Sequence, residues 1–300
     1  MMGWPIQDVV RLLFGALSQG CIYGLVGIGF SLIYNTTGII NFAQGEFVML
    51  GGVLAYCGLA FFNLSLPEAV SLSIAMTMLI GWALQRSIVA PLRRRRAPAF
   101  SYAFTLFGVS IILSNLVLVL VGSEAIIMPP FTPGPPILVF GAAIERQSLW
   151  LIGTTMLVTG ALTLFWTRTI LGKAMRAAAM DPVAAQLVGI PVEKIISRAY
   201  VLSAFFGAIA GAVAAPIILT GYNVGLPVLV KGFIAAIIGG FGSVFGALIG
   251  GLFLALVESY STYFLSSAYR DVISFFVMIT VLIAIPNGLF GRRSGHHSEV

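Results

Sequence analysis

The polar side chains best suited to chemistry in this chain are concentrated between residues 41 and 46. Asn41, Gln44 and Glu46 lie within six residues, and a long uncharged run follows Glu46 directly. A carboxylate at the centre of a membrane costs about 2.5–3.5 kcal/mol on insertion scales, and less near the interface. Two interpretations stay open. Either Asn41, Gln44, Gly45 and Glu46 line a solute path at a broken helix, or Glu46 is an interfacial residue at a helix start, where the helix dipole favours an anion.

A second unusual segment is the glycine-rich stretch at 239–246. Gly239, Gly240 and Gly242 interrupt an apolar run, and irregular backbone at membrane depth is tolerated only where it is buried in protein or lines a cavity. These glycines are therefore further candidates for lining a path. The stretch lacks the Lys-Ser/Thr ending of a phosphate-binding loop, so it predicts no nucleotide site. Glu258, which follows it, is expected at the membrane interface.

The residue types needed for catalysis or metal binding do not form a set in the sequence. The only histidines, His296 and His297, lie in a short polar tail, so the apolar runs lack an imidazole base. Cys21 and Cys57 fall inside apolar runs without metal-ligand spacing, and we expect them to be inert packing groups. We therefore predict no catalytic residue and no metal site, and an intramembrane enzyme is disfavoured.

Composition indicates the elements that must position these residues. Hydrophobic residues make up 59% of the chain and charged residues 9%, whereas about a quarter of a soluble domain is charged. Uncharged runs recur that are long enough to cross a hydrocarbon core of roughly 30 Å as helices, and their continuous rather than alternating pattern disfavours a barrel. We predict an all-α integral membrane protein, a single polytopic bundle over residues 1–300 with about eight or nine membrane segments. The predicted spans are 12–34, 43–62, 67–86, 100–121, 148–166, 198–219, 271–290 and a longer glycine-rich stretch at 229–262.

The placement of basic residues predicts the topology. The net charge of +6 comes from residues between the apolar runs, a pattern typical of topology determinants rather than of nucleic-acid binding. Two basic loops, at 86–96 and 168–198, are separated by two spans, so they share a side that the positive-inside rule makes cytoplasmic. The N-terminus and the 122–147 loop are then outside.

The C-terminal arginines decide how the glycine-rich stretch must run. Arg292 and Arg293 face the cytoplasm only if 229–262 forms a hairpin that turns near 239–246, whereas one broken helix would put them outside. We favour the hairpin. Residues 1–5 lack a basic region before the first apolar run, so we expect no removable signal peptide.

The loop at about 168–197 differs from the rest of the chain because it mixes charges with strong helix formers. Asp181 and Pro182 are typical of an N-cap followed by proline at the first helical position. Gly189 suits a helix stop, and Pro191 prevents the helix from continuing. The loop therefore predicts a short amphipathic helix, which either docks a cytoplasmic partner or lies on the membrane surface.

Three motifs, in order along the chain, resemble the permeases of ABC importers that take up branched-chain amino acids, and the resemblance is closest to their H-type subunits. The first is Tyr23-Gly24-Leu25-x-Gly27-x-Gly29, followed by Gly38-Ile39-Ile40-Asn41-Phe42-Ala43-Gln44-Gly45-Glu46. The second is Gly172-x-x-x-Arg176-Ala177-x-Ala179-x-Asp181-x-x-x-Ala185-x-x-x-Gly189-Ile190. The third is Ala235-Ala236-x-x-Gly239-Gly240-x-Gly242-Ser243-x-x-Gly246-Ala247-x-x-Gly250-Gly251. The resemblance covers about residues 10–290, although the basic run at 93–96 departs from the family pattern.

The resemblance implies a type II-like importer permease in a bacterial inner membrane, paired with a homologous M-type permease. Two cytoplasmic ATPase subunits would bind ATP and Mg, leaving this chain without a cofactor, and a periplasmic or extracellular binding protein would deliver the solute. The residues of this chain that match the family's coupling loop are Gly172, Arg176, Ala177, Asp181, Ala185 and Gly189. The solute would be a branched-chain amino acid, although the family also includes permeases for urea and amides.

An ion-coupled secondary transporter is the alternative. It would need ionisable residues buried within its spans. The predicted span at 100–121 has none, and the span at 198–219 has only Arg198 at its edge. This scarcity favours transport driven by partner ATPases over ion coupling.

Overall fold

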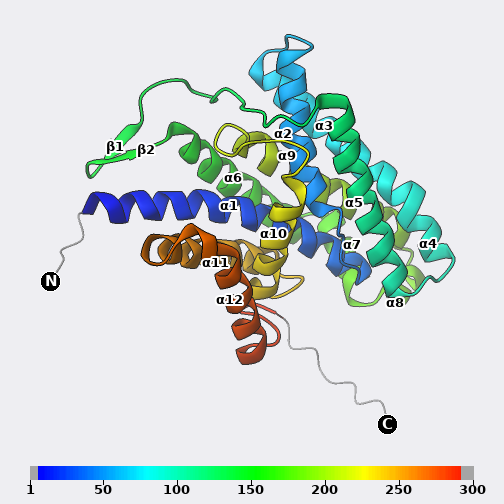
Figure 1. Cartoon of the computed structure of the whole chain (residues 1–300). Coiled ribbons are helices and arrows are strands. Elements are labelled where there is room, and N and C mark those ends of the chain that lie inside the picture. The colour runs from blue at the N-terminus through cyan, green and yellow to red at the C-terminus, as the bar shows by residue number, and fades with distance from the viewer. Residues whose placement is uncertain (1–5, 292–300) are drawn as a thin grey trace.

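The computed structural model describes residues 6–291 and is a bundle of helices with one small β-hairpin (Figure 1). Seven helical segments in this part of the chain are long and apolar enough to cross a membrane, and two apolar helices are shorter. The long segments are α1 (Ile6–Thr37), α3 (Leu66–Leu84) continued through a π-helical turn (Gln85–Val89) into α4 (Ala90–Arg94), α5 (Ala99–Val121), α6 (Arg146–Arg168), α9 (Val192–Ala214), α11 (Val244–Phe264) and α12 (Arg270–Ala284), which a 3-10 turn (Ser267–Tyr269) precedes. The shorter ones are α2 (Gln44–Ala60) and α10 (Gly225–Gly239). The predicted all-α fold of about eight or nine membrane segments is confirmed.

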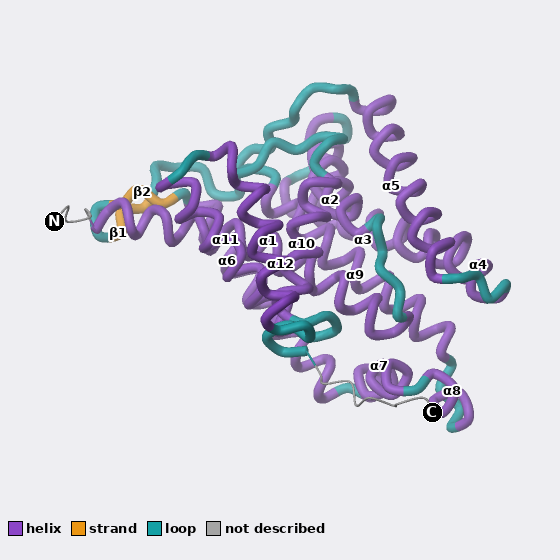
Figure 2. The backbone as a smooth tube through the Cα atoms, turned by 60° about the horizontal axis from the view of Figure 1, so that its bottom comes forward, coloured by secondary structure: helices purple, strands orange, loops and turns teal. Residues whose placement is uncertain are grey.

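The remaining elements mark the two ends of the bundle. The strands β1 (Ile137–Val139) and β2 (Ala142–Ile144) pair antiparallel, with Ile137 opposite Ile144, and pack near the start of α1. The short helices α7 (Ile170–Met180) and α8 (Pro182–Leu187) lie at the other end, far from the β-hairpin (Figure 2). The two loops predicted to face opposite sides of the membrane therefore lie at opposite ends of the bundle.

Close packing at glycines holds the centre of the bundle together. A Cβ atom added to Gly20 of α1 would lie 2.7 Å from the Cα atom of Leu252 of α11, and one added to Gly211 of α9 would overlap the backbone of α2. Such contacts bring helix backbones together, as small residues do in membrane bundles. By contrast, α5 and α12 bury few of their side chains and lie at the periphery.

The predicted hairpin is present, as α10 and α11 joined at residues 240–243. Gly240 and Gly242 have φ angles of +96° and +89°, which favour glycine because a side chain is strained there. The hairpin packs directly against α1 and against the segment that follows α12. In that segment, the Leu289 and Phe290 amides donate hydrogen bonds to carbonyls at the end of α10, at 2.9 and 3.0 Å.

Several predicted boundaries were wrong. The last span ends at Ala284 rather than at 290, because Pro286 disfavours helical backbone at the residue before it. Helix α9 begins at Val192, six residues earlier than predicted, since Pro191 and not the basic residues marks its start. The arginines at 292 and 293, the tail histidines and residues 1–5 lie outside the described residues.

Candidate functional site

The Glu46 carboxylate is buried in the first turn of α2. Its side chain accepts hydrogen bonds from the hydroxyls of Ser110 and Ser114 on α5, at 2.7 and 2.9 Å. The residue is only 1% exposed, and within residues 6–291 it forms no ion pair. Ser110 and Ser114 are the twelfth and sixteenth of the 23 residues of α5, which is about 35 Å long at 1.5 Å per residue. The carboxylate therefore lies beside the middle of α5 and is enclosed by protein, which favours the interpretation of Glu46 as a path residue over that of an interfacial residue.

Two helix starts meet at this carboxylate. Glu46 is in the first turn of α2, and the first residue of α10, Gly225, is so close that a Cβ atom added there would lie 2.5 Å from a Glu46 oxygen. Gly45 packs against the same residue, and a Cβ atom on Gly45 would overlap the Gly225 carbonyl. The positive ends of two helix dipoles thus face a carboxylate that no cation neutralises within the described chain. Such half-helix starts at mid-depth are where transporters bind charged solutes.

Gln44 ties this region to two other helices. Its amide oxygen accepts a hydrogen bond from the Ser203 hydroxyl on α9 at 2.5 Å, and its amide nitrogen donates to the Ser203 carbonyl at 3.3 Å. The same hydroxyl lies 2.9 Å from the Gly29 carbonyl on α1. Both polar atoms of the Gln44 side chain are therefore hydrogen-bonded, and they tie the start of α2 to α9.

Asn41 precedes α2 and is completely buried. Its side-chain oxygen accepts a hydrogen bond from the Ala43 amide at 3.1 Å, which shapes the turn into α2. Its side-chain nitrogen has no partner among the described residues. Such an unpaired donor is unusual, since buried donors are nearly always paired.

The glycine-rich turn does not join this polar centre. Gly242 accepts a hydrogen bond from the Asn35 side chain at 2.5 Å, near the end of α1. A cavity of about 640 Å³ is lined by Gly242 together with Arg176 and Ala179 of α7. The predicted path residues thus divide into two groups, one at mid-depth and one beside the α7–α8 loop.

The α7–α8 loop has the local structure that its sequence predicts. The Asp181 side chain accepts hydrogen bonds from the Val183 and Ala184 amides at 2.8 and 3.0 Å and caps α8, which begins at Pro182. Gly189 follows the helix with a φ angle of +84°. The short helix is therefore fixed at both ends.

The predicted coupling residues differ in exposure. Gly172 is buried against α6, where a Cβ atom would lie 2.5 Å from the Phe165 carbonyl, and Ala185 is buried as well. Arg176, Asp181 and Gly189 are exposed and Ala177 is half-buried. Apolar side chains next to them are exposed to solvent, namely Met180, Val183, Leu187 and Val188. The loop thus packs against the bundle through buried residues and presents an exposed apolar surface on its other side chains.

A cluster of charged residues between four helices was missed by the sequence analysis. Glu258 of α11 is completely buried, and its carboxylate pairs with Lys231 of α10 at 2.7 Å and with Arg270 of α12 at 2.9 Å. Tyr23 of α1 donates a hydrogen bond to it at 2.9 Å. Glu258 is therefore a paired residue inside the protein, close to the start of α12. Lys231, a cation inside a predicted span, was the feature of the sequence that could have indicated this cluster. Its position also shows that ionisable residues in the spans are less scarce than the argument against ion coupling assumed.

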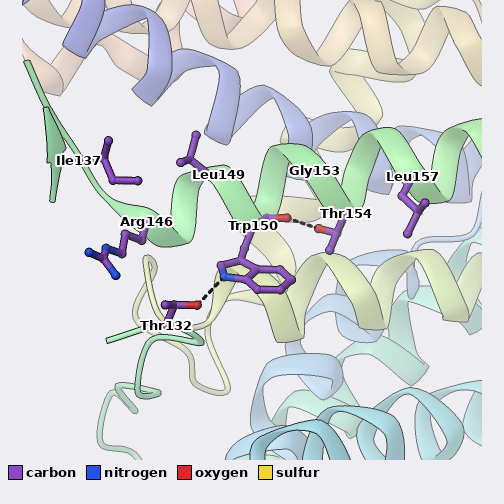
Figure 3. A pocket seen from close by; sticks show the side chains of 8 residues that line it. All are labelled: Thr132, Ile137, Arg146, Leu149, Trp150, Gly153, Thr154 and Leu157. Atoms are coloured by element: carbon purple, nitrogen blue, oxygen red, sulfur yellow. Dashed lines mark hydrogen bonds between the residues drawn. The ribbon is translucent and has the colours of Figure 1, made fainter. Parts of the chain in front are cut away.

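Figure 3 shows a separate pocket of about 520 Å³ beside the first half of α6. Apolar side chains line most of it, and the Trp150 indole donates a hydrogen bond to the Thr132 hydroxyl at 2.9 Å. Arg146 lies at its edge. None of the predicted site residues lines this pocket, so it is distinct from the polar centre around Glu46.

Comparison with known proteins assigns the class. The sequence profile of the family described as "Branched-chain amino acid transport system / permease component" matches residues 12–282. The high-affinity branched-chain amino acid transport system permease protein LivH of Salmonella typhimurium is 32% identical, over 94% of this chain and 96% of the relative. The corresponding protein BraD of Pseudomonas aeruginosa is 33% identical, over 96% and 97%. A solved structure, PsaBC from Streptococcus pneumoniae in complex with a Fab, matches at 12% identity over 95% of this chain and 93% of that chain, with a TM-score of 0.48.

The chain belongs to the family of permease components of branched-chain amino acid ABC transport systems. It is therefore a transport subunit rather than a catalytic chain, and a multi-pass membrane protein related to bacterial inner-membrane permeases. Membership of the family implies ATPase and binding-protein partners.

Proposed function

We propose that this chain moves branched-chain amino acids into the cytoplasm as the H-type half of a permease pair, with a homologous M-type chain as the other half. Two ATPase subunits dock on the loop at 168–197 and bind the ATP and Mg, while this chain holds no cofactor. A binding protein delivers the solute at the opposite end of the bundle. The N-terminus is then outside, and the C-terminus is in the cytoplasm.

The surface of α8 is the observation that carries the docking role. Val183 is 68% exposed and Leu187 is 83% exposed, although both are apolar, while Ala185 between them is buried. Exposed apolar patches mark contact sites on proteins. The Asp181 cap fixes this patch in one orientation. Because α8 contacts both α7 and α9, a displacement of α8 would move these two helices as well.

The mid-depth centre is the proposed solute path. Glu46 offers a carboxylate that pairs with no cation among the described residues, and Asn41 offers an amide donor without a partner there. Gly45 and Gly225 bring the starts of α2 and α10 into close contact beside this carboxylate. The ammonium group of an amino acid suits the carboxylate as it passes. Gln44, Gly239, Gly240 and Gly242 support the two groups of path residues by holding α2 and the hairpin turn.

A charge placed on α8 tests the docking role. Leu187→Glu puts a carboxylate into the proposed contact and should abolish co-purification of the ATPase subunits with the permease pair. Phe62→Glu is the matched control, since Phe62 is 69% exposed at the opposite end of the bundle, and it should leave co-purification intact. Unchanged co-purification with Leu187→Glu would refute the docking role and favour a helix on the membrane surface.

A further inference from the structure

The charged cluster is built around Glu258, which orients two cations at once. One carboxylate oxygen accepts from Lys231 at 2.7 Å, and the other accepts from Arg270 Nε at 2.9 Å. Ser274 donates to the same carboxylate, and Lys231 also donates to Ser274 at 2.7 Å and pairs with Asp271 at 2.8 Å. Two positive and two negative side chains are therefore held in fixed positions. Burying the Glu258 carboxylate is costly unless its ion pairs have nearly ideal geometry.

The cluster forms one wall of a cavity of about 390 Å³. Lys231, Arg270 and Asp271 line it together with apolar residues, including Ile22, Ile218 and Val228. This volume is within the roughly 300–1,000 Å³ of small-molecule sites, which combine mostly apolar walls with a few fixed polar groups.

The irregular segment after α9 lines this cavity at the end of the bundle away from α7 and α8. Thr220 and Ile126 form an isolated antiparallel bridge, with N–H···O distances of 2.7 and 3.0 Å. The bridge ties this segment to the 122–136 loop, and Leu219 and Ala125, beside the bridge, line the cavity. The cavity thus lies where a solute delivered from that end would arrive.

The charges that face the cavity retain unused bonding capacity. Arg270 donates one hydrogen bond from Nε to Glu258 and one from Nη2 to the Tyr23 hydroxyl at 3.3 Å, so most of its five N–H groups remain available to a ligand. Asp271 uses Oδ1 for Lys231, and its side chain is 78% exposed. A carboxylate can therefore bind at Arg270, and an ammonium group can bind at Asp271.

We propose that this cavity binds the zwitterionic head and the apolar side chain of a branched-chain α-amino acid. The solute carboxylate pairs with Arg270, the solute ammonium pairs with Asp271, and the side chain packs on the apolar wall. Glu258 is a positioning residue that holds Arg270 and Lys231 in place. The choice of solute rests on the proposed function, whereas the zwitterion chemistry follows from the cavity itself.

A protection experiment on the permease–ATPase complex in nanodiscs, without ATP and binding protein, tests this site. Leu219→Cys puts a thiol on the cavity wall in a background in which the native cysteines are replaced by serine, and its modification by N-ethylmaleimide is timed. L-Leucine at roughly nine times its Kd should slow the modification about tenfold, because only the unoccupied fraction reacts. The analogues 4-methylpentanoate and 3-methylbutylamine each lack one charge and should protect much less at the same concentration. Phe62→Cys, outside the cavity, should react at the same rate with and without the probes.

Asp271→Asn assigns the ammonium contact. It should weaken protection by L-leucine and leave protection by 4-methylpentanoate unchanged. Two outcomes would overturn the proposal: equal rates of thiol modification with and without L-leucine, or equal protection by all three probes. Both can be measured without substituting any residue of the charged cluster. If L-leucine gives no protection in a complex that still holds its ATPases, the cavity proposal fails and the docking proposal stands. If L-leucine protects but the ATPases do not dock on the loop at 168–197, only the docking proposal fails.

Discussion

Replacing Asp181 with alanine should loosen α8 by an amount that the structure allows us to estimate. The Asp181 carboxylate is the acceptor for two of the first amides of α8, at 2.8 and 3.0 Å. Loss of an N-cap of this kind costs about 1 kcal/mol, within a range of roughly 0.5–2 kcal/mol. The helix has six residues and cannot recover the loss by extension, because Gly189 and Pro191 stop it.

A cost of about 1 kcal/mol corresponds to about a fivefold change in the equilibrium between closed and open α8. Hydrogen exchange followed by mass spectrometry on a peptide covering 182–190 should therefore show protection reduced about fivefold. ATP-driven leucine uptake by the assembled importer should fall as well, because the docking surface is ordered for less of the time.

Asp181→Asn is the matched control, since asparagine caps helices about as well as aspartate. It should retain most of the exchange protection and the uptake. Unchanged exchange in Asp181→Ala, or an equal loss in both variants, would refute the capping argument. Reduced exchange protection together with normal leucine uptake in Asp181→Ala would mean that coupling to the ATPases does not depend on how well α8 is ordered.

Three further predictions concern the rest of the bundle. Gly211→Ala should lower the melting temperature of the assembled complex, because its Cβ atom would overlap a carbonyl of α2 and overpacking typically costs about 1–3 kcal/mol of stability. Gly153→Ala has open space around the new Cβ atom and should leave the melting temperature unchanged. Glu46→Gln should assemble normally but reduce leucine uptake by about tenfold or more, the effect of losing roughly 1.4 kcal/mol of charge interaction; uptake at the normal rate would remove Glu46 from the path. Single cysteines at Ser243 and at Leu64 should react with impermeant reagents from opposite sides of the membrane, and labelling from the same side would contradict the proposed topology.

Local signals in the sequence were sufficient for the α7–α8 loop and for the hairpin. Capping by Asp181 and the positive φ of Gly189 depend on neighbours in the chain, so residue type alone predicts them. The hairpin followed from a charge argument that used Arg292 and Arg293, and it rested on the requirement that both ends of 229–262 share a side.

The charged cluster was beyond such reasoning because its geometry is tertiary. Lys231 and Glu258 are 27 residues apart, and Arg270 reaches Glu258 from a third helix. Their pairing depends on the rotation and depth at which α10, α11 and α12 pack, which no periodicity in one helix determines. The depth of Glu46 was open for the same reason, since it is set by Ser110 and by the start of α10.

The measurement closest to the central claim is leucine uptake into proteoliposomes that contain the permease pair, the ATPases and the binding protein. We predict that uptake requires ATP inside the compartment that holds the ATPases, is abolished by Leu187→Glu, and is unaffected when the proton gradient is dissipated. Accumulation of leucine by this chain without ATPase partners, driven by a proton gradient, would contradict the account.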